Sequence, residues 1–66
     1  MTGRVKYMID TLIDKRSHGN PALVKMMHIK LKLKGISPDH YSWTSEDDPV
    51  VIEKLNNLAK ELGINI

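Results

Sequence analysis

Apolar residues recur along this 66-residue chain with the period of α-helices in two clear segments. Over residues 4–17 and again over residues 49–62, they are spaced three or four positions apart, which places them on one side of a helix. The first set is Val5, Met8, Ile9, Leu12 and Ile13, and the second is Val51, Ile52, Leu55, Leu58, Ala59 and Leu62. Each segment therefore predicts an amphipathic helix with one buried face.

The segment between them, residues 21–34, has two interpretations. From residue 28 to residue 34, polar and apolar residues alternate strictly, which is the period of a half-buried strand that residues 41–44 would pair with. Against this, Asn20 is a helix-capping residue, Pro21 suits the first helical position, and Ala, Leu, Met and Lys are strong helix formers. We predict a helix over residues 21–34 and keep the strand over residues 28–34 as the alternative.

Wound as a helix, this middle segment is apolar over more than half of its circumference and cationic over the remainder. The first apolar stripe is Ala22, Met26, Ile29 and Leu33, the second is Leu23, Met27 and Leu31 with Val24 beside it, and the cationic face is Lys25, His28 and Lys32. Two neighbouring helices need not cover so much apolar surface. Core filling is the favoured use of the excess, and a binding groove or a dimer face stays open as the other.

Turn residues separate the three predicted helices. Gly35-Ile36 and Gly63-Ile64 are typical helix ends, and Asp48-Pro49 is a typical helix start. The long connection before Asp48 has room for one helical turn over residues 37–41, and its aromatic residues, Tyr41 and Trp43, are expected to cover one end of the core. We predict an all-α fold, a small three-helix bundle of orthogonal or up-down type, as a single domain over residues 1–66.

Charge is distributed unevenly along the chain, although the net charge is only +2. Residues 1–34 hold eight Lys and Arg against two Asp, a net of +6, whereas residues 35–66 hold two Lys against six Asp and Glu, a net of −4. Such a division serves an acidic partner, a complementary second copy, or the two halves of the fold itself.

Catalytic and metal-binding motifs are not predicted. His18, His28 and His40 are too far apart in sequence to share one helix face, so we expect three solvent-facing histidines. The acidic run over residues 46–48 lacks calcium-loop spacing and stands where a helix start favours negative charge. The four glycines are isolated, which excludes a phosphate-cradling loop. We expect no enzyme activity, cofactor, metal or small-molecule substrate.

The sequence also indicates where in the cell the protein is located. It has no Cys, which fits a reducing environment, and no apolar run approaches the ~20 residues that span a bilayer. We expect a cytoplasmic protein that does not associate with membranes. Whether the chain stands alone or belongs to a larger protein is left open.

A protein partner or a second copy is the predicted ligand. The apolar candidates for this contact are Met26, Met27 and Leu31, and the electrostatic candidates are Arg16, Lys25, His28 and Lys32. The alternative is weak, non-specific nucleic-acid binding by the same basic face. Scarce Arg and a long second connection, unlike the short turn of a helix-turn-helix, make base recognition the less favoured function. A third interpretation is a spacer in a larger assembly.

Overall fold

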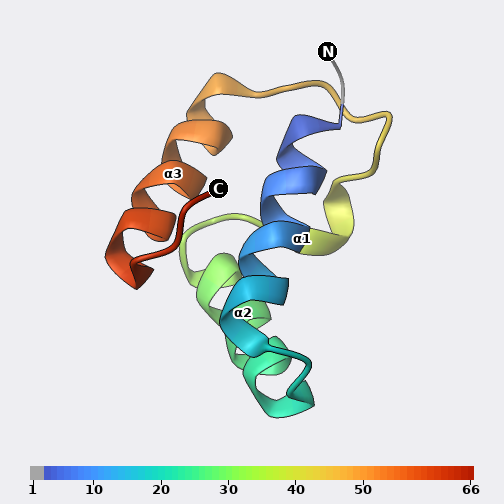
Figure 1. Ribbon diagram of the computed structural model, residues 1–66. Coiled ribbons are helices and arrows are strands. Elements are labelled where there is room, and N and C mark those ends of the chain that lie inside the picture. The colour runs from blue at the N-terminus through green and yellow to red at the C-terminus, as the bar shows by residue number, and fades with distance from the viewer. Residues whose placement is uncertain (1–2) are drawn as a thin grey trace.

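The computed structural model describes residues 3–66, which form the three helices that the sequence predicts (Figure 1). Helix α1 spans Arg4–Ser17, α2 spans Pro21–Leu33 and α3 spans Pro49–Leu62, with a short 3-10 turn, η1, at Pro38–His40. In Figure 1, α1 and α3 run downward and α2 runs upward, as in an up-down arrangement. The all-α prediction is confirmed, and α2 ends one residue earlier than expected.

The capping residues identified in the sequence start α2 and α3. The Asn20 side chain accepts a hydrogen bond from the backbone N–H of Ala22 at 3.0 Å, and the Asp48 side chain accepts one from Val50 at 3.0 Å. A proline follows each cap, where the missing N–H has no partner to lose. Both helix starts are therefore set by local sequence.

Helices α2 and α3 end in the same motif. The backbone N–H of Ile36 donates to the carbonyl oxygen of Leu31 at 2.9 Å, and that of Ile64 donates to Ala59 at 2.8 Å. These are the six-to-one bonds of the Schellman motif, and each is followed by an apolar contact. Ile36 is fully buried in the core, and Ile64 is half-buried and packs against the core residues. Because α2 continues helically to Leu33, the strand alternative is wrong for these residues.

The start of α1 is held by residues far away in the sequence. The backbone N–H of Gly3 donates to the carbonyl oxygen of Ser45 at 3.1 Å, and that of Arg4 donates to the Asp47 carboxylate at 3.0 Å. Asp47 thus satisfies a first-turn amide of α1, while its neighbour Asp48 caps α3. The acidic run was expected to serve α3 alone, and in the structure it serves two helices.

Helix α1 is the centre of the hydrophobic core. It packs against both α2 and α3, which make fewer contacts with each other. Apolar residues from all three helices and the second connection are buried together: Val5, Met8, Ile9, Leu12, Met27, Leu31, Ile36, Val51, Leu55, Leu58 and Ala59. The C-terminal segment turns back toward α1, where the Lys15 ammonium donates to the carbonyl oxygen of Asn65 at 2.7 Å.

The two aromatic residues of the second connection differ in their role. Tyr41 packs against the core, as expected. Trp43 is not among the residues that pack against the core, is more than half exposed, and lies over Gly3 at the start of α1. A side chain on Gly3 would place its Cβ 2.8 Å from the carbonyl oxygen of Trp43, closer than real Cβ atoms come.

The close approach of Trp43 to Gly3 predicts how a side chain at Gly3 would change the free energy of unfolding. Gly3 has a φ of +81°, so Gly3→Ala combines an unfavourable backbone conformation with a collision against Trp43. Gly19 supplies the matched control: its φ is +83° and an added Cβ would meet nothing within 4 Å, so Gly19→Ala meets the backbone cost alone. We expect Gly19→Ala to lower the free energy of unfolding by about 1–2 kcal/mol and Gly3→Ala by at least about 1 kcal/mol more. Equal losses in urea denaturation followed by circular dichroism would contradict the contact.

Candidate functional site

The two apolar stripes of α2 lie on different sides of the helix, and only one of them enters the core. The inner stripe consists of Leu23, Met27 and Leu31. Met27 is 2% exposed and Leu31 is fully buried against α1, while Leu23 is half-buried. Two of the three predicted apolar contact residues, Met27 and Leu31, are therefore core residues in this structure.

The outer stripe of α2 consists of Ala22, Met26, Ile29 and Leu33, and it faces solvent. The exposed fractions of its three large side chains are 63% for Met26, 59% for Ile29 and 82% for Leu33. Successive members are four, three and four residues apart, which is the spacing of a coiled-coil seam. Of the predicted apolar contacts, Met26 belongs to this stripe. Ile29 and Leu33 were not selected from the sequence, although their spacing was visible there.

Lysines border the outer stripe on both sides. At 100° per residue, Lys25 and Lys32 follow one edge and Lys30 follows the other. Lys25 and Lys32 are exposed and Lys30 is half-buried, and we call these three residues the edge lysines. None of them forms an ion pair with a described residue. By contrast, Lys34 pairs with Glu61 of α3 at 3.3 Å. Two of the predicted cations, Lys25 and Lys32, and also Lys30 thus stand beside apolar side chains without an ion pair to any acid of residues 3–66.

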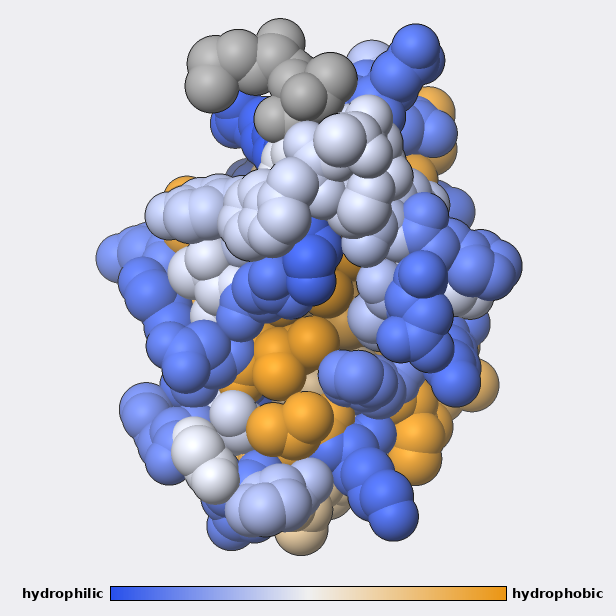
Figure 2. Space-filling view, turned by 90° about the vertical axis from the view of Figure 1, so that its right-hand side faces the viewer, coloured by the Kyte–Doolittle hydropathy of each residue, from blue (hydrophilic) through white to orange (hydrophobic). Residues whose placement is uncertain are grey.

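The remaining predicted contact residues are Arg16 and His28, and of these two only Arg16 lies beside the outer stripe. Arg16 at the end of α1 lines a small hollow of about 100 Å³, whose other lining residues are Leu23, Met26, Met27, Lys30 and Leu62. The fold therefore brings Arg16 to the Lys30 edge of the outer stripe. His28 is half-buried on the side of α2 that carries Lys25 and Lys32, and it is not part of the stripe. Figure 2 shows apolar side chains reaching the surface among hydrophilic ones, at the level that α2 occupies in Figure 1.

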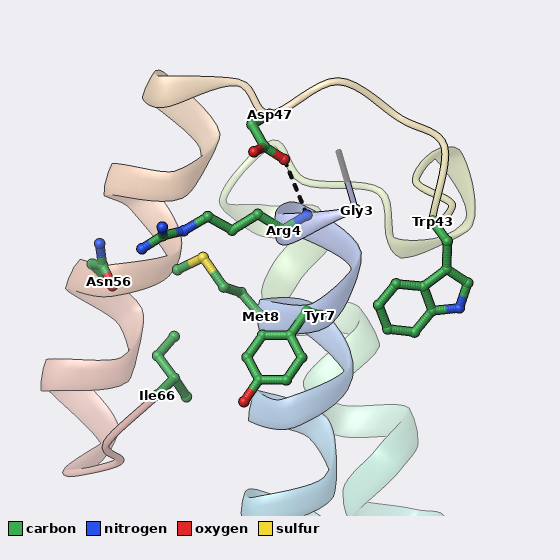
Figure 3. Close-up of a pocket in the computed structure, with 8 residues that line it drawn as sticks. All are labelled: Gly3, Arg4, Tyr7, Met8, Trp43, Asp47, Asn56 and Ile66. Carbon is green, nitrogen blue, oxygen red and sulfur yellow. Dashed lines mark hydrogen bonds between the residues drawn. The ribbon is translucent and has the colours of Figure 1, made fainter. Parts of the chain in front are cut away.

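A larger hollow of about 600 Å³ lies at the other end of α1, between Trp43 and the C-terminal segment (Figure 3). In Figure 3, Arg4 extends from α1 toward α3, where Asn56 lies, with Met8 beneath it. Tyr7 and Trp43 are more than half exposed at its margin. The full lining is Gly3, Arg4, Tyr7, Met8, Trp43, Asp47, Asn56 and Ile66.

Two contacts hold the Asp47 and Trp43 side of this larger hollow. The Asp47 carboxylate accepts from the Arg4 amide, as the dashed line in Figure 3 marks, and the Lys6 ammonium stands 5.9 Å from the centre of the Trp43 ring.

Histidine and acidic side chains are dispersed over the molecule. His18 and His40 are exposed and His28 is half-buried. Within residues 3–66, no three His, Asp or Glu side chains come close enough to hold a metal ion. In the same residues, none of the helices is long and apolar enough to cross a membrane.

Comparisons of the chain with protein-family models, curated proteins and solved structures give no match. Function therefore has to be inferred from the chain's own residues. Three of the exposed large apolar side chains, Met26, Ile29 and Leu33, lie in one row on α2.

The assignment of the two stripes is tested by two identical substitutions on one helix. Leu31→Ala removes a fully buried side chain, and we expect it to lower the free energy of unfolding by about 2–5 kcal/mol. Leu33→Ala, two residues further on, removes a side chain that is 82% exposed, and we expect a change within about 0.5 kcal/mol. Helix propensity changes equally in both variants. If Leu33→Ala were the more costly substitution in chemical denaturation, the orientation of α2 would be wrong.

Proposed function

We propose that the protein is a small, non-enzymatic helical module that acts by binding another protein, and that the outer stripe of α2 is its contact surface. The observation that carries this proposal is the line of Met26, Ile29 and Leu33, all more than half exposed on one helix. Single exposed apolar residues are ordinary on monomers, whereas a continuous row bordered by polar residues is typical of interaction sites. Self-association through this stripe would be the same kind of contact, and sedimentation equilibrium detects it.

The stripe is suited to binding because it is already ordered. Burial of a large apolar side chain contributes about 1.5–3 kcal/mol, less the part that is already covered. Association also costs free energy for lost motion, and that cost is lower when the contacting side chains stand on a preformed helix. Three such residues support a contact of modest affinity, to which charges at the edges add selectivity.

Nucleic-acid binding is the second candidate function, and the unpaired edge lysines favour it. Lysines along a helix can follow a phosphate backbone and release its counterions. That contact would leave Met26, Ile29 and Leu33 facing hydrated phosphates, so it does not account for the outer stripe. We also propose a cytoplasmic location, which rests on the lack of Cys in the sequence.

The proposal is tested with a variant that removes the stripe without changing charge. Ile29→Gln with Leu33→Gln keeps helix-forming residues at both positions. Affinity capture from cell extract would use the wild-type chain, this double variant and a control, Val50→Gln, which changes a similarly exposed residue on α3. We expect a captured protein, or the protein's own copy in sedimentation equilibrium, to be lost with the double variant and kept with the control.

The salt dependence separates the two candidate functions. Between about 50 mM and about 300 mM salt, a contact through apolar side chains loses only the part of its affinity that charges at its edges supply, whereas contacts to phosphates weaken steeply because screening and counterion release both act on them. A chain that binds mixed-sequence duplex DNA only at low salt, and whose partners ignore the Gln substitutions, would contradict the protein-binding function and favour the alternative.

A further inference from the structure

The edges of the outer stripe carry one sign of charge only. Helix α2 contains no Asp or Glu, and the edge lysines stand on both sides of the apolar row. At the Lys30 edge, Arg16 of α1 adds a fourth cation across the small hollow that also contains Met26. Whatever packs on this stripe therefore meets positive charge along both of its borders.

A second copy is a poor occupant for this reason. In a parallel pair of α2 helices, the Lys25 and Lys32 edge of one copy meets the Lys30 edge of the other. In an antiparallel pair, each edge meets its own equivalent. Both arrangements bring lysines together, and like charges at the flanks of a helical seam oppose pairing.

A membrane surface fits the stripe less well than a helix does. Helices that lie in a lipid interface usually carry a wide apolar face that includes Trp or Phe. The outer stripe is one seam wide and has no aromatic residue, and the exposed aromatic residues Tyr7 and Trp43 line the other hollow instead. A seam at four-three-four spacing matches the side-chain rows of a second helix.

Building on the proposed function, we infer that the partner presents an amphipathic helix with acidic flanks, which packs on Met26, Ile29 and Leu33 while its Asp or Glu residues pair with the edge lysines. Its apolar residues recur three and four positions apart, and acidic residues border them on both sides. Acids that reach the small hollow also approach Arg16. The excess of positive charge in residues 1–34 would then contribute to binding this partner.

Three synthetic helices of about three heptads each serve as probes. The first has Leu in its seam and Glu at both flanks, the second has the same seam with Lys at the flanks, and the third keeps the Glu flanks with Gln in the seam. Titration calorimetry at about 50 mM salt gives the affinity of each for the full chain. We expect the first probe to bind at least about tenfold more tightly than either of the others.

Two charge-matched double variants locate the contact. Lys25→Glu with Lys32→Glu should weaken the Glu-flanked probe by at least about tenfold and strengthen the Lys-flanked probe. Lys54→Glu with Lys60→Glu makes the same change of net charge on exposed positions of α3, and we expect it to alter either affinity by less than about threefold. Circular dichroism of each variant establishes that its fold is retained.

Each of the other possible binding results would contradict a different part of the proposal. Equal binding of the Glu-flanked and Lys-flanked probes would overturn the acidic partner and leave the protein-binding function standing. Equal binding of the two Glu-flanked probes would show that the stripe takes no part, and the proposed function would fail with it. If none of the probes bound, while vesicles of phosphatidylcholine and phosphatidylserine or duplex DNA did, the acidic helix would be the wrong class of partner.

Discussion

The fold depends on α1, which packs against both of the other helices. The apolar face of α1, with Ile9 and Leu12 at its centre, is buried against both α2 and α3, which touch each other less. Helix α2 therefore buries the side that meets α1 and leaves the opposite side in solvent, which is why its outer stripe is exposed.

Much of the fold could be predicted because its rules are local. Asn20 and Asp48 cap the helices that follow them, and Gly35-Ile36 and Gly63-Ile64 close α2 and α3 through bonds that span six residues. A capping side chain or a Schellman ending acts on its own neighbours, so the residues alone identify it. The helical period over residues 28–33 likewise outweighed the alternation that suggested a strand.

What could not be predicted depends on contacts between distant residues. The two stripes of α2 are alike in composition, and only the position of α1 decides that Leu31 is buried and Leu33 exposed. The contact residues chosen from the sequence therefore include two that the structure buries, Met27 and Leu31, beside one that it exposes, Met26. The hydrogen bond between Arg4 and Asp47 joins residues 43 positions apart, and no local pattern announces it.

The central claim is that the outer stripe of α2 is the surface that receives a partner. Methyl NMR of the protein, with and without a Glu-flanked amphipathic helix, tests it most directly, because each methyl group reports its own surroundings. The account predicts large shifts for Met26, Ile29 and Leu33, and small ones for Met8 and the distant Val50. Shifts centred on Met8 and Ile66, which line the larger hollow, with Ile29 and Leu33 unmoved, would contradict it.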